Sequence, residues 1–196
     1  MTMPPSYTSF AGHHRIAAGS LQTVALAVKQ AQDAGLSGPV LTFDDDSGRV
    51  VEIDTRGSNN EVLARLTSGT SAPEDTIPAD EEPRGRGRPR LGVVAREVTL
   101  LPRHWDWLNG QPGGASVTLR KLVDEARREN VDRDRQRHAQ ERAYRFMSAI
   151  AGDLPGFEDA TRALFAQDQM MFDRHTRSWP DDLRAYATRL AFGVAS

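Results

Sequence analysis

Arginine alternates with glycine and proline along residues 83–90, which carry the sharpest chemical signal in the chain. Guanidinium groups are permanent cations that match the geometry of phosphate and carboxylate oxygens. Glycine and proline between the arginines favour a slim, extended backbone. We therefore expect this segment to bind an anionic partner, with an affinity that falls as the salt concentration rises.

Residues 84–90 resemble an AT-hook, a DNA-binding motif whose core reads Arg-Gly-Arg-Pro, here residues 86–89. The resemblance implies that the core arginines lie in the narrow minor groove of A·T-rich DNA, where the negative potential is strong. The outer arginines would reach phosphates. The alternative is a solubilising linker, because 23 of the 25 basic residues are arginine and such clusters arise easily here. The predicted contacts are Arg84, Arg86, Gly87, Arg88, Pro89 and Arg90.

The second signal covers residues 96–128. We expect a short strand at 96–101, a helix from Pro102 to about Asn109, a break at 110–114, and a second helix capped by Ser116. This order resembles a ribbon-helix-helix DNA-binding unit. The resemblance implies that two chains pair their strands in the major groove, with Arg96 facing the bases. Ser116 and Thr118 would match the phosphate-binding start of the second helix.

The register of the expected strand departs from that family. If Leu101 faces inward, as the resemblance implies, Val98 and Leu100 face the bases and offer no hydrogen-bonding groups. Either the register is shifted or the unit is a packing scaffold. Because a lone strand leaves its backbone groups unpaired, we predict a homodimer through residues 96–128, with pairing to the N-terminal sheet as the alternative.

The fold class is predicted to be α+β, in four segments. These are a small α+β domain at 1–67, a disordered linker at 68–92, the ribbon-helix-helix-like unit at 93–129, and a helical region at 130–196. The linker begins acidic and ends basic, without apolar periodicity. The expected elements are strands at 7–10, 15–17, 39–43 and 49–53 and helices at 21–34, 60–66, 127–150 and 157–173, with a last helix opened by a capping box at 178–181.

Several chemistries find no support in the sequence. There is no cysteine, and no phosphate loop, nucleophile elbow or zinc-binding pattern occurs. The acidic turn at 44–48 departs from a calcium loop because its glycine is at the fifth position. We expect no metal or cofactor, no signal peptide, no membrane span and a cytoplasmic location.

Taken whole, the chain resembles a bacterial family known only as domain of unknown function 2239. The matching stretches are 10–13, 87–108, 113–117 and 146–157. The resemblance implies no activity. The leading hypothesis is a non-enzymatic, DNA-associated protein, transcriptional or nucleoid-related. The alternatives are a protein-interaction module that binds an acidic partner and, third, an enzyme with an unrecognised site.

Overall fold

The computed structural model describes residues 6–35, 38–68, 94 and 96–193. These residues belong to two compact units, with unit 1 falling within 1–72 and 133–196 and unit 2 within 73–132. The described residues form a four-stranded antiparallel sheet and seven helices, so the predicted α+β class is confirmed. The segments 1–67 and 130–196, assigned by sequence to separate domains, both contribute to unit 1. The predicted linker lies outside the described residues except for Ser68.

The sheet of unit 1 has the strand order β2-β1-β3-β4. Its strands are β1 (Tyr7–Ala11), β2 (His14–Gly19), β3 (Val40–Asp44) and β4 (Val50–Val51). The four predicted strands are confirmed, although β4 is shorter than the expected 49–53. Phe10 of β1 lies opposite Leu41, and Thr8 lies opposite Phe43. Because side chains alternate along a strand, these four residues share one face of the sheet.

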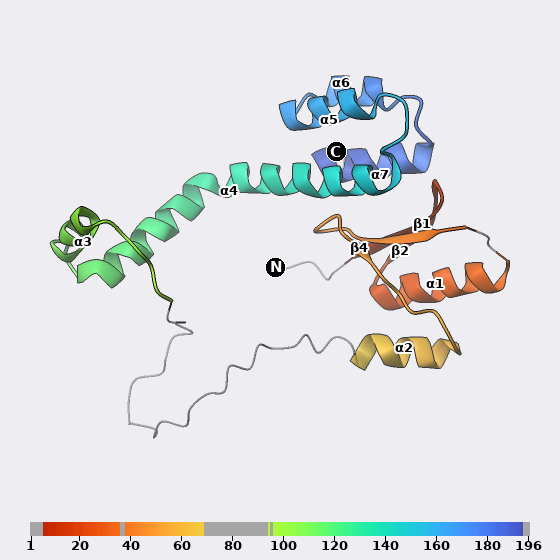
Figure 1. Cartoon of the computed structure of the whole chain (residues 1–196), viewed down its shortest axis with the longest axis horizontal. Helices are drawn as coiled ribbons and strands as arrows, with labels where there is room; N and C mark the ends of the chain where they lie inside the picture. The colour runs from red at the N-terminus through yellow and green to blue at the C-terminus, as the bar shows by residue number, and fades with distance from the viewer. Residues whose placement is uncertain (1–5, 36–37, 69–93, 95, 194–196) are drawn as a thin grey trace. The chain divides into compact units, whose positions relative to one another are not determined.

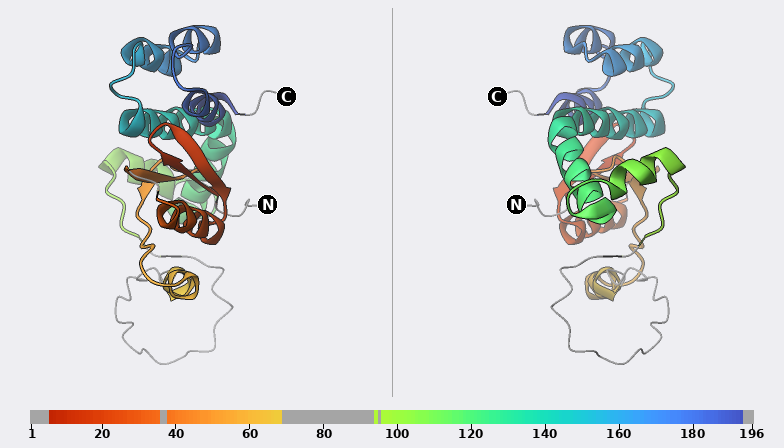
Figure 2. Two further views of the ribbon diagram at one scale, coloured as in Figure 1. Left: turned by 90° about the vertical axis from the view of Figure 1, so that its right-hand side faces the viewer. Right: turned by 90° about the vertical axis from the view of Figure 1, so that its left-hand side faces the viewer.

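The other face of the sheet is covered by the helix α1 (Leu21–Asp33), as Figures 1 and 2 show. Ser20 caps this helix by accepting a hydrogen bond from the backbone N–H of Thr23. Its buried side chains are Val24, Ala25 and Val28, spaced to lie on one stripe. The helix α2 (Asn59–Ser68) follows the sheet in the chain.

Four helical segments complete unit 1 on the Phe10 face of the sheet. They are residues 133–150 of α4 (Gly114–Ile150), α5 (Phe157–Ala166), α6 (Gln169–His175) and α7 (Asp181–Phe192). Phe146 of α4 packs with its ring centroid 5.4 Å from that of Phe10, 4.9 Å from Phe43 and 4.6 Å from Tyr186. This aromatic cluster joins the sheet to α4 and α7.

The turn between β3 and β4 lies against the backbone of α4. Gly48 has φ +67°, and a Cβ atom at this position would overlap the carbonyl of Arg142. Arg145 donates a hydrogen bond from Nη1 to the carbonyl of Ser47 at 2.9 Å. Glycine is required here both by the backbone conformation and by the close approach.

Two helix boundaries differ from the sequence predictions. The expected single helix at 157–173 is interrupted where Gln167 adopts φ 58° and Asp168 caps α6 by accepting from the N–H of Met171. Apolar spacing continues across this break, so periodicity alone does not reveal it. The predicted capping box at 178–181 is wrong, because the N-cap is Pro180 and no side chain caps α7. The expected helix at 127–150 is confirmed as the second part of the continuous helix α4, in which Glu141 and Arg145 are paired at 3.2 Å.

Candidate functional site

Unit 2 contains the expected two helices but not the expected strand. The helix α3 (Pro102–Asn109) begins with proline in its first turn, as predicted. Residues 96–101 form no strand and pair with no other described segment, so the predicted strand is absent from this single chain. A strand exists only when its backbone groups bond a neighbouring strand, and the described part of the chain supplies no such neighbour.

The start of α4 also differs from the prediction. Gly113 and Gly114 have φ values of 91° and 72°, and the helix begins at Gly114. Ser116 therefore lies inside the first turn and is not the N-cap. The two glycines make the sharp turn out of α3, and the helix starts three residues earlier than a cap at Ser116 would place it.

The sequence-predicted DNA contacts are only partly described. Residues 84–90 lie outside the described residues. Arg96 is exposed before α3, while Ser116 is exposed and Thr118 is half-buried near the start of α4. Within the described residues no hydrogen bond joins these three side chains. Between residues 96 and 132 there are six basic and six acidic residues, so this part of unit 2 carries no net charge.

Unit 2 leaves nearly all its apolar side chains uncovered. Leu108 is the only buried residue among described positions 94 and 96–132. An open groove of about 270 Å³ lies beside it, and Trp107 and Leu122 on its walls are 53% and 42% exposed. We call this the apolar groove; its lining residues are Leu100, His104, Trp107, Leu108, Leu119 and Leu122. Trp105 is half-buried and Trp107 is exposed, so neither tryptophan of this unit is buried.

The apolar groove also bears on the register of 96–101. Leu100 lines the groove of its own chain, whereas Leu101 is 48% exposed. The resemblance implied the opposite arrangement, with Leu101 inward. Because residues 96–101 form no strand, this placement describes how they pack and not a strand register.

In unit 1 the acidic turn at 44–48 makes hydrogen bonds that local sequence patterns did not predict. Asp44 accepts hydrogen bonds from the N–H groups of Asp46 and Ser47 and so closes the turn. Asp45 turns inward, with only 13% of its side chain exposed. Its carboxylate accepts hydrogen bonds from Ser6 Oγ at 2.9 Å, Thr8 Oγ1 at 2.8 Å, Tyr186 Oη at 2.7 Å and Arg189 Nη2 at 3.2 Å.

The Asp45 cluster fixes the two α7 residues that join it. Burial, and then the hydrogen bond to Asp45, raises the pKa of Tyr186 well above its ordinary value. The guanidinium of Arg189 lies 4.8 Å from the centre of the Tyr186 ring. The Nε atom of Arg189 is buried and has no hydrogen-bond partner among the described residues.

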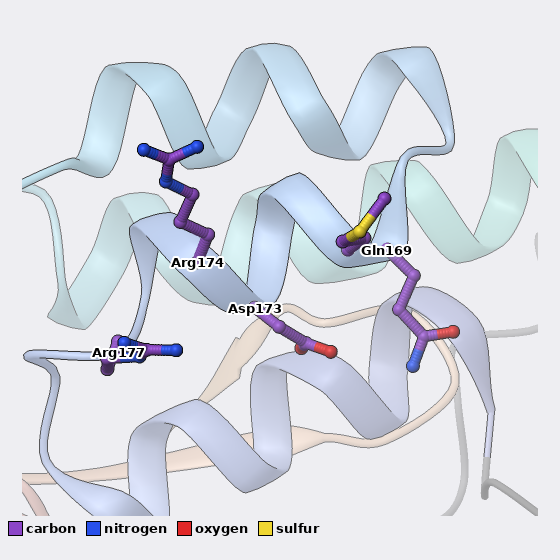
Figure 3. A pocket seen from close by; sticks show the side chains of 5 residues that line it. Gln169, Asp173, Arg174 and Arg177 are labelled. Atoms are coloured by element: carbon purple, nitrogen blue, oxygen red, sulfur yellow. The ribbon is translucent and has the colours of Figure 1, made fainter.

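Arg189 also lines a groove formed by α6, α7 and the turn between them. Two adjoining clefts of about 670 and 690 Å³ share Asp173 and Arg177 as lining residues. Figure 3 shows Asp173 and Arg174 standing out from α6, with Arg177 on the turn that follows. We call this the arginine groove; its charged and hydroxyl-bearing residues are Asp173, Arg174, Arg177, Arg184, Thr188 and Arg189. Local sequence patterns missed this groove because its residues belong to separate elements.

Within the described ranges, no group of three or more histidine, aspartate or glutamate side chains is arranged to hold a metal ion. None of the described helices is long and apolar enough to cross a membrane.

Comparison with known proteins identifies the family alone. No curated protein and no solved structure matches the chain. The model of a bacterial family described as "Uncharacterized protein conserved in bacteria (DUF2239)" matches residues 6–191. The chain therefore belongs to this family.

Proposed function

We propose that the protein is a non-enzymatic, cytoplasmic DNA-associated protein that acts as a homodimer through residues 96–128. Arg84, Arg86, Arg88 and Arg90 of each chain would contact the A·T-rich minor groove. The observation that carries the proposal is that Leu108 alone is buried among the described residues of unit 2. A folded segment with so little buried apolar surface needs a partner to cover the rest.

A second copy of the chain suits this surface better than an unrelated protein. Residues 96–101 are unpaired in the single chain, and two copies related by a two-fold axis would each supply the strand that the other lacks. The same association would bring Trp107 and Leu122 of each copy out of water. Residues 96–132 carry no net charge. This also favours self-association, because two identical surfaces without net charge do not repel each other.

Dimerisation would matter for DNA affinity. Each chain carries one set of linker arginines, and two sets on one dimer bind the same duplex with a raised effective concentration. The placement of Leu100 in the apolar groove gives the 96–101 segment a packing role. We therefore assign the preference for A·T-rich sequence to the linker rather than to major-groove readout.

Substituting both core arginines of the linker, Arg86→Ala with Arg88→Ala, is expected to abolish the preference for A·T-rich over G·C-rich duplexes. The variant loses two arginines that contact phosphates or the minor groove. The slope of log affinity against log salt concentration should therefore become less negative by about 2. Fluorescence anisotropy with both duplexes at two salt concentrations measures these effects. The matched control is Arg137→Ala with Arg162→Ala, which removes two exposed arginines elsewhere. If the wild type binds both duplexes weakly and alike, an acidic protein becomes the better partner.

Placing a charge in the apolar groove, with Trp107→Glu and Leu122→Glu, is expected to convert a dimer into a monomer of 21.6 kDa. Both side chains are largely exposed in the single chain, so its own stability should change little. Light scattering at micromolar concentration reads the mass. The matched control is Val131→Glu, an exposed apolar position of α4 outside the groove. A wild-type chain that is already monomeric at this concentration refutes the dimer.

A further inference from the structure

The arginine groove of unit 1 plays no part in the proposed function. It lies on α6, α7 and their connecting turn, and its two clefts are each about as large as a small-molecule site. Four guanidinium groups line it, against the single carboxylate of Asp173. Such an excess of positive charge in a concave surface attracts anions.

Two of the four arginines carry no counter-ion. Arg174 and Arg177 form no ion pair within the described residues; in Figure 3 Arg177 extends from the turn on the side of Asp173, whereas Arg174 points away from it. Arg184 is paired with Asp181 at 3.0 Å, but the Asp181 side chain is 92% exposed and therefore holds it weakly.

The fourth arginine, Arg189, is held in place before any ligand arrives. Its Nη2 atom donates to Asp45 at 3.2 Å and lies 3.4 Å from Thr8 Oγ1, and its Cζ atom is 4.8 Å from the Tyr186 ring centre. Its Nε atom is buried and has no hydrogen-bond partner in the described part of the chain. An arginine fixed by three neighbours loses little side-chain entropy when it binds an anion.

We propose that the arginine groove is a binding site for a phosphate group, held by Arg177, Arg184 and Arg189, which line the same one of its two clefts. Guanidinium groups favour phosphate because they bind two of its oxygens at once. The hydroxyl of Thr188 adds a further donor beside them. Asp173 is an acceptor in the same groove, so a phosphate ester that also carries hydroxyl groups fits better than inorganic phosphate. The phosphate belongs either to a small sugar phosphate or to a nucleic-acid backbone.

Isothermal titration of the full-length protein with ribose 5-phosphate tests the site, with ribose and inorganic phosphate as comparison ligands. The variant Arg177→Gln with Arg184→Gln should lower the affinity for ribose 5-phosphate at least tenfold. The control Arg137→Gln with Arg162→Gln removes the same charge from surfaces outside the groove and should change it less than twofold. Thermal unfolding of both variants checks that each remains folded.

A parallel titration with an A·T-rich duplex identifies the source of the phosphate. If only ribose 5-phosphate binding falls in the groove variant, the ligand is a small phosphate ester. If duplex binding alone falls, or falls as well, the groove contacts a nucleic-acid backbone. An unchanged affinity for both probes, or an equal fall in the groove variant and the control, overturns the proposal. Arg86→Ala with Arg88→Ala should leave ribose 5-phosphate binding unchanged. A failure of the groove proposal can therefore be distinguished from a failure of the linker proposal.

Discussion

Phe146→Ala is expected to lower the free energy of unfolding of unit 1 by about 3–5 kcal/mol, the range for emptying a buried phenylalanine site. Phe146 is fully buried and its ring meets those of Phe10, Phe43 and Tyr186. The loss therefore acts on the sheet, α4 and α7 together. Because the free energy of unfolding of a domain is of order 5–15 kcal/mol, this substitution should remove a large part of it.

The chain offers a sensitive readout for this change. It has three tryptophans, and only Trp179 belongs to unit 1, where it is 3% exposed. In a Trp105→Phe, Trp107→Phe background, urea unfolding followed by fluorescence reports on unit 1 alone. Phe165→Ala is the matched control, because that side chain is 51% exposed and its loss should cost no more than about 1 kcal/mol. Equal midpoints for the two variants would contradict the assigned core.

Asp45→Ala is expected to lower the stability of unit 1 by about 2–4 kcal/mol. The change leaves the buried hydroxyls of Thr8 and Tyr186 without their acceptor and removes the counter-ion of Arg189. The ionic part is discounted because the Arg189 side chain is 40% exposed. The same urea experiment measures the effect.

Two neighbouring substitutions calibrate the Asp45 result. Asp46→Ala removes an exposed carboxylate from the same turn and should change stability by no more than about 0.5 kcal/mol. Tyr186→Phe removes one of the four donors while keeping the ring and should cost about 1 kcal/mol. If Asp45→Ala is as mild as Asp46→Ala, the cluster contributes no stability and Asp45 does not hold Arg189.

Local patterns in the sequence were sufficient for most elements of unit 1. The Ser20 cap and the apolar spacing that follows it predicted α1, and the acidic turn predicted the β3–β4 hairpin. These features depend on residues within about ten positions of one another. The same holds for α3, whose first turn is marked by Pro102.

The candidate sites could not be predicted in the same way. Asp45 and Tyr186 are 141 positions apart, and no local pattern pairs a turn carboxylate with a helix hydroxyl at that separation. The arginine groove likewise combines Arg177 from a turn with Arg189 from the last helix. The prediction of a strand at 96–101 failed for a different reason. The described part of one chain supplies no strand that pairs with these residues.

The discontinuity of unit 1 has a consequence for biosynthesis. Its sheet is translated long before α7, and at about 5–20 residues per second the interval between Asp45 and Tyr186 is roughly 7–30 s. During that time the face bearing Phe10 and Phe43 lacks the helices that cover it, whereas α1 on the opposite face can already pack. The nascent chain therefore passes through a state with one apolar sheet face in water, which is the kind of surface that ribosome-associated chaperones recognise.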